Sequence, residues 1–136
     1  MSNIAIYLHK FSDLKNVLDA NCREIIISTH HFSRFGQLSI EQGNTAIETL
    51  SSTKKIFLDW DILMTENVFS QKKMQLNKLN LKLITGFRVQ DVGAFHYVLE
   101  NFPDHEIHLV LESGNHNLQA IKKWESFGGK QLSRIV

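Results

Sequence analysis

The chain has 136 residues, 43% hydrophobic and 21% charged, which suits one hydrophobic core, so we expect residues 1–136 to form a single domain. The 15 basic and 14 acidic residues leave a formal charge of +1, which gives no support to long-range attraction by nucleic acid or an anionic membrane. No apolar run approaches the roughly 18 residues of a membrane span and the amino end lacks a signal-peptide pattern, so we expect a cytoplasmic protein.

Segments with the periodicity of strands and of helices alternate along the chain. Strands are predicted at residues 3–8, 24–28, 55–60, 81–87, 106–111 and 131–136. Helices are predicted at residues 11–20, 40–50, 66–79, 91–101 and 117–127. Ser39 and Gln42 resemble a capping box before the second helix, and Gly128-Gly129 is a natural end for the fifth.

Five strand–helix pairs followed by a strand predict an α/β fold with a parallel sheet. Because LHKFSD follows the first strand in place of a Gly-rich fingerprint, we favour a TIM-barrel-like (β/α) fold, incomplete at about five and a half units, over the alternative, an open doubly wound sheet. The chain stops inside an apolar strand, so we expect the N-terminal fragment of a larger barrel protein. The apolar edges IAIYL and LSRIV predict a dimer or higher oligomer.

Metal binding within the chain has little support. Cys22 is the only cysteine, so an internal disulfide and a site of several thiolates are excluded, and we interpret it as a small structural residue. His30 and His31 are adjacent, and adjacent side chains of an extended segment point to opposite sides. We therefore predict no metal site.

Chemically capable residues follow the strands, at the end where parallel α/β folds place their sites. Asp59 and Asp61 are two residues apart and suit acid–base partners or a divalent ion, although Asp61 also suits a helix cap. Asp91 opens a helix, where capping is the expected role.

Among the residues at this end of the strands, Arg88 is best placed to hold a carboxylate or phosphate, although it is also placed to pair with Glu112. The segment ESGNHN offers amides and an imidazole to a substrate, or forms a turn with Asn117 as the helix cap. No Ser-His-Asp arrangement or nucleophile elbow is present, so no catalytic residue is assigned.

Three segments together resemble the N-terminal half of the collagenase-like peptidases, peptidase family U-32. They are REIIISTHHFSRF (23–35), FRVQDVGA (87–94) and EIHLVLESGNHNLQAIKKWESFGGKQLSRIV (106–136). The family's Phe-Ser/Asn-x-Arg loop is matched by Phe32, Ser33 and Arg34, with the Arg directly after Ser. Its Gln-Asp-x-Gly motif is matched by residues 90–93. The family's Ser-Thr-Gln is replaced by Leu-Glu-Ser, and its Arg-Glu element after the sixth strand is absent.

The resemblance implies an eight-stranded barrel, of which this chain would be the first five and a half units. It also implies a peptidase or hydrolase label, or hydroxylation of RNA or of a quinone precursor as in other members. Iron–sulfur ligands would lie downstream in a full-length protein, with no cofactor in this chain. The substrate-binding candidates are His31, Arg34, Asp61, Arg88, Gln90 and Asn117.

Two alternatives remain open. A non-catalytic binding or assembly module of truncated barrel type would need no cluster ligands. An unrelated aldolase-like barrel enzyme has less support, because no Lys follows a strand and Lys82 falls inside one.

Overall fold

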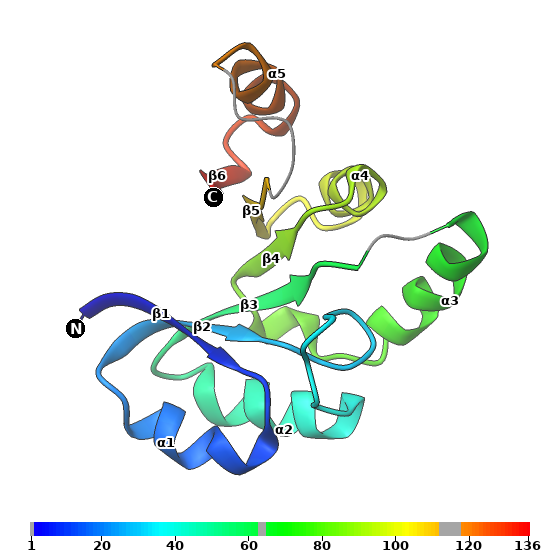
Figure 1. Ribbon diagram of the computed structural model, residues 1–136. Helices are drawn as coiled ribbons and strands as arrows, with labels where there is room; N and C mark the ends of the chain where they lie inside the picture. Colours follow the sequence, from blue (N-terminus) through cyan, green and yellow to red (C-terminus); the bar gives the residue numbers. More distant parts are fainter. Residues whose placement is uncertain (1, 63–64, 112–117) are drawn as a thin grey trace.

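Strands and helices alternate along the chain in the computed structural model, which describes residues 2–62, 65–111 and 118–136 (Figure 1). The strands are β1 (Ser2–Leu8), β2 (Cys22–Ile27), β3 (Lys55–Trp60), β4 (Gly86–Val89), β5 (Glu106–Leu109) and β6 (Leu132–Ile135). The helices are α1 (Leu14–Asp19), α2 (Ile40–Leu50), α3 (Glu66–Leu76), α4 (Val92–Asn101) and α5 (Leu118–Gly128). Short 3-10 turns occupy Phe11–Asp13 and Leu81–Leu83.

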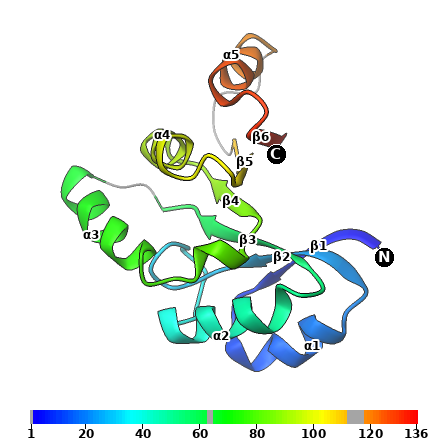
Figure 2. The ribbon, with the colours of Figure 1, turned by 180° about the vertical axis from the view of Figure 1, so that it is seen from behind.

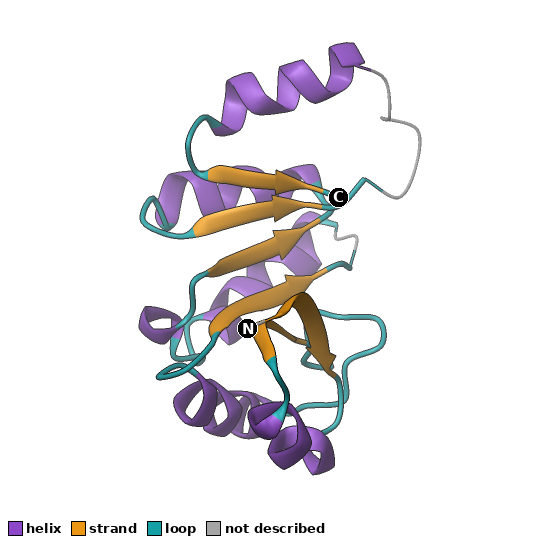
Figure 3. Ribbon diagram, turned by 90° about the vertical axis from the view of Figure 1, so that its left-hand side faces the viewer, coloured by secondary structure: helices purple, strands orange, loops and turns teal. Residues whose placement is uncertain are grey.

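All six strands are parallel and lie in the order β1-β2-β3-β4-β5-β6. Figure 3 shows them side by side in an open sheet. The predicted α/β fold with a parallel sheet is therefore confirmed. A doubly wound sheet reverses its strand order at a switch point, whereas this order is that of successive strands in a βα-barrel. The order favours the incomplete barrel-like arrangement, and the sheet is not closed.

The helices lie on the convex side of the curved sheet, and the concave side is left uncovered by helices (Figures 1 and 2). Alternate strand residues point to opposite faces, so each strand contributes to both sides. The convex side carries the main hydrophobic core. From β2 to β5 its members include Ile25, Ile27, Ile56, Leu58, Trp60, Phe87, Val89, Ile107 and Leu109.

Polar residues lie on the concave side, at strand positions that alternate with the core residues just named. Asp59, Arg88 and His108 are register neighbours on β3, β4 and β5. His108 is buried, and its ring stacks on that of Phe57 with centroids 4.0 Å apart. A ligand entering from this side therefore meets these polar and charged side chains, together with the apolar Ile26 and Phe57, and does not meet the main core.

Two sequence expectations about helix starts are confirmed. Ser39 and Gln42 form the expected capping box, with Ser39 Oγ accepting from the Gln42 amide at 3.1 Å. Asp91 caps α4 by accepting from the Ala94 amide at 3.0 Å. The helix α5 ends at Gly128, and Gly129 adopts φ +54°, as its place after the helix implied.

Two other expectations are wrong. The strand predicted at 81–87 begins only at Gly86, because residues 81–83 form a 3-10 turn. The helix predicted at residues 66–79 ends at Leu76, and its apolar residue Met74 is 69% exposed. Met74 precedes the buried Leu76 by two residues, which places it on the opposite side of the helix.

No helix in the described part of the chain combines the length and hydrophobicity needed to cross a bilayer.

Candidate functional site

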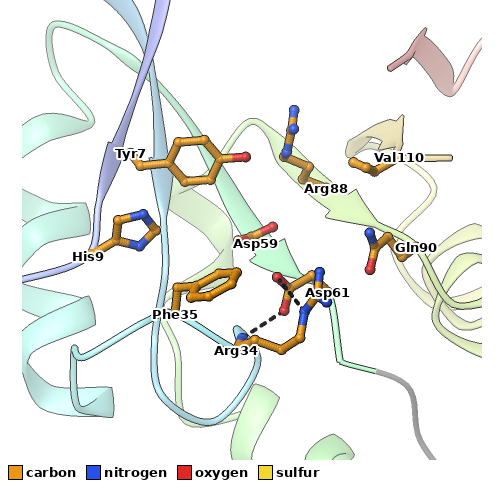
Figure 4. Close-up of a pocket in the computed structure, with 9 residues that line it drawn as sticks. All are labelled: Tyr7, His9, Arg34, Phe35, Asp59, Asp61, Arg88, Gln90 and Val110. Atoms are coloured by element: carbon orange, nitrogen blue, oxygen red, sulfur yellow. Dashed lines mark hydrogen bonds and ion pairs between the residues drawn. The ribbon is translucent and has the colours of Figure 1, made fainter. Parts of the chain in front are cut away.

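A pocket of about 250 Å³ opens at the carboxyl ends of the strands (Figure 4). Residues from β1, the loop after β2, and the ends of β3, β4 and β5 converge on it. They are Tyr7, His9, Arg34, Phe35, Asp59, Asp61, Arg88, Gln90 and Val110. The parallel topology brings these chain segments together, because all carboxyl ends lie on one rim.

Asp59 is the buried acid of this pocket. Its position near the end of β3, a strand buried at every residue after Lys55, leaves it 5% exposed. The Ser33 hydroxyl donates a hydrogen bond to its Oδ2 at 3.1 Å. Burial, and then the neighbouring carboxylate of Asp61, raise the pKa of Asp59 to about 6. Asp59 therefore exchanges its proton near pH 6.

Asp61 joins the loop after β2 to the end of β3. Its Oδ1 accepts from the Arg34 backbone amide at 2.9 Å, and its Oδ2 lies 3.5 Å from Arg34 Nε. Its own backbone amide donates to the Phe32 carbonyl at 3.0 Å. The helix α3 instead has Thr65 at its N-cap, so the alternative role of Asp61 as the cap of this helix is wrong.

Arg88 lies on β4 and Gln90 directly follows the last residue of this strand; the two are two residues apart, and both line the pocket. The guanidinium carbon of Arg88 lies 5.6 Å from the centroid of the Tyr7 ring. Figure 4 shows the Arg88 side chain extending beside this ring, while Arg34 and Asp61 pair with each other.

The structure brings together four of the six candidate residues: Arg34, Asp61, Arg88 and Gln90. His31 is not among the residues that line this pocket. Its ring lies 4.0 Å from that of His30, and burial followed by the charge of His30 lowers its pKa. Asn117 lies outside the described residues, as does Glu112.

Tyr7, His9, Phe35 and Val110 also line the pocket and were not among the candidates. Tyr7 sits inside an apolar strand pattern, where nothing in the sequence marks it as a ligand contact. The sequence does indicate Asp59 as a residue of the site, because a carboxylate inside the apolar run KIFLDW has to be buried or paired.

The residues of this chain do not fit an iron–sulfur cluster, which is held by several cysteine thiolates. Cys22 is the only cysteine, is 1% exposed, and lies 3.7 Å from Lys54 Nζ at the amino end of the sheet. Across the described ranges, no group of three His, Cys, Asp or Glu side chains is placed to hold a metal ion.

Comparison with known proteins places the chain in a family. No curated protein and no solved structure was found to match it. The model of the family described as peptidase family U32 matches residues 9–136, which includes the pocket residues from His9 onward. The chain therefore belongs to peptidase family U32.

Proposed function

We propose that the chain carries a substrate pocket of a collagenase-like U32 peptidase, and that Asp59 transfers protons there during peptide hydrolysis. The observation that carries this proposal is the burial of Asp59 in the rim pocket with a pKa raised to about 6. Membership of peptidase family U32 supports peptide hydrolysis as the class of reaction in this proposal.

Peptide hydrolysis needs a group that takes a proton from the attacking water and later gives one to the leaving amine. A carboxyl group with a pKa near the working pH performs both steps efficiently. Asp61 supports this role because its charge holds the pKa of Asp59 up, and Arg34 fixes its position.

A non-catalytic binding or assembly module is the alternative, and the open edges at β1 and β6 favour it. In that case the pocket binds a ligand without turnover. The oligomer, the cytoplasmic location and an iron–sulfur cluster in a longer protein stay predictions. Hydroxylation of RNA or of a quinone precursor gains no support from the pocket residues.

The test is to incubate the folded chain with gelatin peptides and to quantify newly released amino groups. We expect Asp59→Asn to lower the rate by about a hundredfold or more, the usual contribution of a general acid–base group. Asp104→Asn is the matched control, because it makes the same substitution at an exposed turn before β5. Both variants are checked for folding by thermal unfolding.

The pH profile of the wild-type rate adds a second readout. An inflection near pH 6 that is absent from Asp59→Asn is expected when Asp59 transfers the proton. Absence of released amines from the folded wild type would favour the non-catalytic module. Equal rates for Asp59→Asn and wild type would remove Asp59 from the mechanism.

A further inference from the structure

Among the residues that the structure describes, Arg88 has no anionic partner, unlike Arg34 and Arg134. Arg34 holds Asp61, and Arg134 holds Glu24 through two contacts of 2.9 and 3.2 Å. Within residues 2–62, 65–111 and 118–136, no carboxylate lies within ion-pair distance of Arg88 and its side chain makes no hydrogen bond.

The surroundings keep the Arg88 guanidinium in the pocket. The side chain is half-buried, and the Tyr7 ring lies beside the guanidinium at 5.6 Å. Such a ring stabilises the cation through its face but leaves the donor N–H groups available. The fork of Arg88 is thus positioned and open to an acceptor.

The titratable neighbours of Arg88 on the adjoining strands form no ion pair with it. His108 pairs in register with Arg88, and burial, followed by the charge of Arg134, lowers its pKa to about 4, so it is neutral near pH 7. Asp59 pairs in register on the other side and its charge interacts with that of Arg88, but it lies beyond ion-pair distance and its Oδ2 accepts from the Ser33 hydroxyl. Asp61 is already paired with Arg34.

We propose that Arg88 binds an oxyanion of the substrate, a carboxylate or a phosphate, in the fork that faces this pocket. A planar guanidinium matches the two oxygens of such a group with parallel hydrogen bonds, and this is the partner its geometry recognises best. The pocket of about 250 Å³ admits the group together with a short part of the molecule that carries it.

The identification of the oxyanion as part of a substrate rests on the proposed function, whereas the binding itself does not. A peptide would supply the carboxylate from its carboxyl terminus or from an acidic side chain. A phosphate would come from a phosphorylated substrate. Both present the same acceptor to Arg88.

The test titrates sodium acetate and, separately, sodium phosphate into the whole chain at constant ionic strength. Binding is followed by the NMR shifts of the backbone amides of Tyr7, Arg88 and Gln90. We expect saturable shifts for at least one anion, and an affinity at least about tenfold weaker in Arg88→Gln, because a charge-assisted contact is lost. Arg88→Lys keeps the charge without the fork and is expected to fall between the two.

Arg23→Gln is the matched control, since it removes one exposed positive charge at the amino end of β2. Its affinity should equal that of wild type. Saturation by acetate alone assigns a carboxylate, and saturation by phosphate alone assigns a phosphate. No saturable shift with either anion, or equal binding by Arg88→Gln, overturns the proposal.

Asp59→Asn separates this proposal from the proposed function. It should lower turnover by about a hundredfold or more yet bind the anion at least as tightly as wild type, because a carboxylate beside Arg88 has been removed. Loss of anion binding in Arg88→Gln with turnover unchanged would place the oxyanion outside the substrate.

Discussion

The pKa values of two buried residues on the concave side are shifted in opposite directions. Burial and Asp61 raise the pKa of Asp59 to about 6, while burial and Arg134 lower the pKa of His108 to about 4. Between pH 3.8 and about 6, Asp59 keeps its proton in the folded chain, whereas the unfolded chain, with the ordinary pKa of 3.8, loses it. The stabilisation from this proton is full at low pH and is lost as pH rises through about 6. The stabilisation from neutral His108 depends on pH in the opposite sense. It is full above pH 6.5 and is lost as the pH falls toward 4.

Asp59→Asn isolates the contribution of Asp59, because His108 is common to both proteins. We expect the two proteins to have similar free energies of unfolding near pH 4. The variant should become more stable than wild type as pH rises to 7, by at most roughly 3 kcal/mol, since one pKa unit is about 1.4 kcal/mol. Urea unfolding across this pH range measures the difference. A difference that does not change with pH would mean that the pKa of Asp59 is not raised.

Asp61→Asn provides a direct check on the cause. Removing the Asp61 charge should lower the pKa of Asp59, which carbon NMR of the Asp59 carboxyl measures. Burial remains in this variant, so the pKa should stay above its ordinary value. This outcome separates the charge of Asp61 from burial.

At the scale of the element, β4 depends on a residue without a side chain. Gly86 begins this strand, and a Cβ there would fall on the Glu106 carbonyl oxygen of β5, 2.7 Å from the carbonyl carbon. Gly86 pairs in register with Phe57, whose ring stacks on His108 of β5, across β4. The glycine therefore permits both the close approach of β5 and the ring contact above it.

Gly86→Ala should destabilise the chain by about 2 to 3 kcal/mol, because backbone of β5 has to move to relieve the overlap. Gly129→Ala serves as a comparison. A Cβ at Gly129 meets no atom within 4 Å, and its φ of +54° costs about 1 kcal/mol in a residue with a side chain. Denaturant unfolding ranks the two variants, and equal losses would show that the approach of β4 to β5 adapts freely.

The sequence predicted most elements because the two periodicities differ clearly along this chain. The prediction of a strand at residues 81–87 was wrong in its first part. Leu81 and Ile84 pack against the core from a turn, and a short apolar run does not distinguish a turn from a strand. For the site, Arg88 and Gln90 were found because they directly follow the strand predicted at residues 81–87. Tyr7 was missed because its exposure to the pocket depends on the curvature of the sheet, which no local pattern encodes.

At the scale of the whole molecule, an ion pair reports that curvature. Glu24 on β2 and Arg134 on β6 meet through two contacts, although β3, β4 and β5 lie between their strands. In a flat sheet these strands would be about 19 Å apart, four spacings of roughly 4.8 Å. The sheet has to bend toward its concave side for the two side chains to touch.

A double-mutant cycle with Glu24→Gln and Arg134→Gln measures what this contact contributes. Because Arg134 is partly exposed, we expect a coupling free energy of only about 1 kcal/mol, falling as salt is added. Either single variant should also speed amide hydrogen exchange in β6, which pairs only with β5 in the described sheet, and leave β2 and β3 protected. Arg23→Gln on the same strand as Glu24 should change neither readout. Zero coupling with unchanged exchange in β6 would mean that the bend of the sheet is set by backbone pairing and helix packing, with the ion pair a consequence of it.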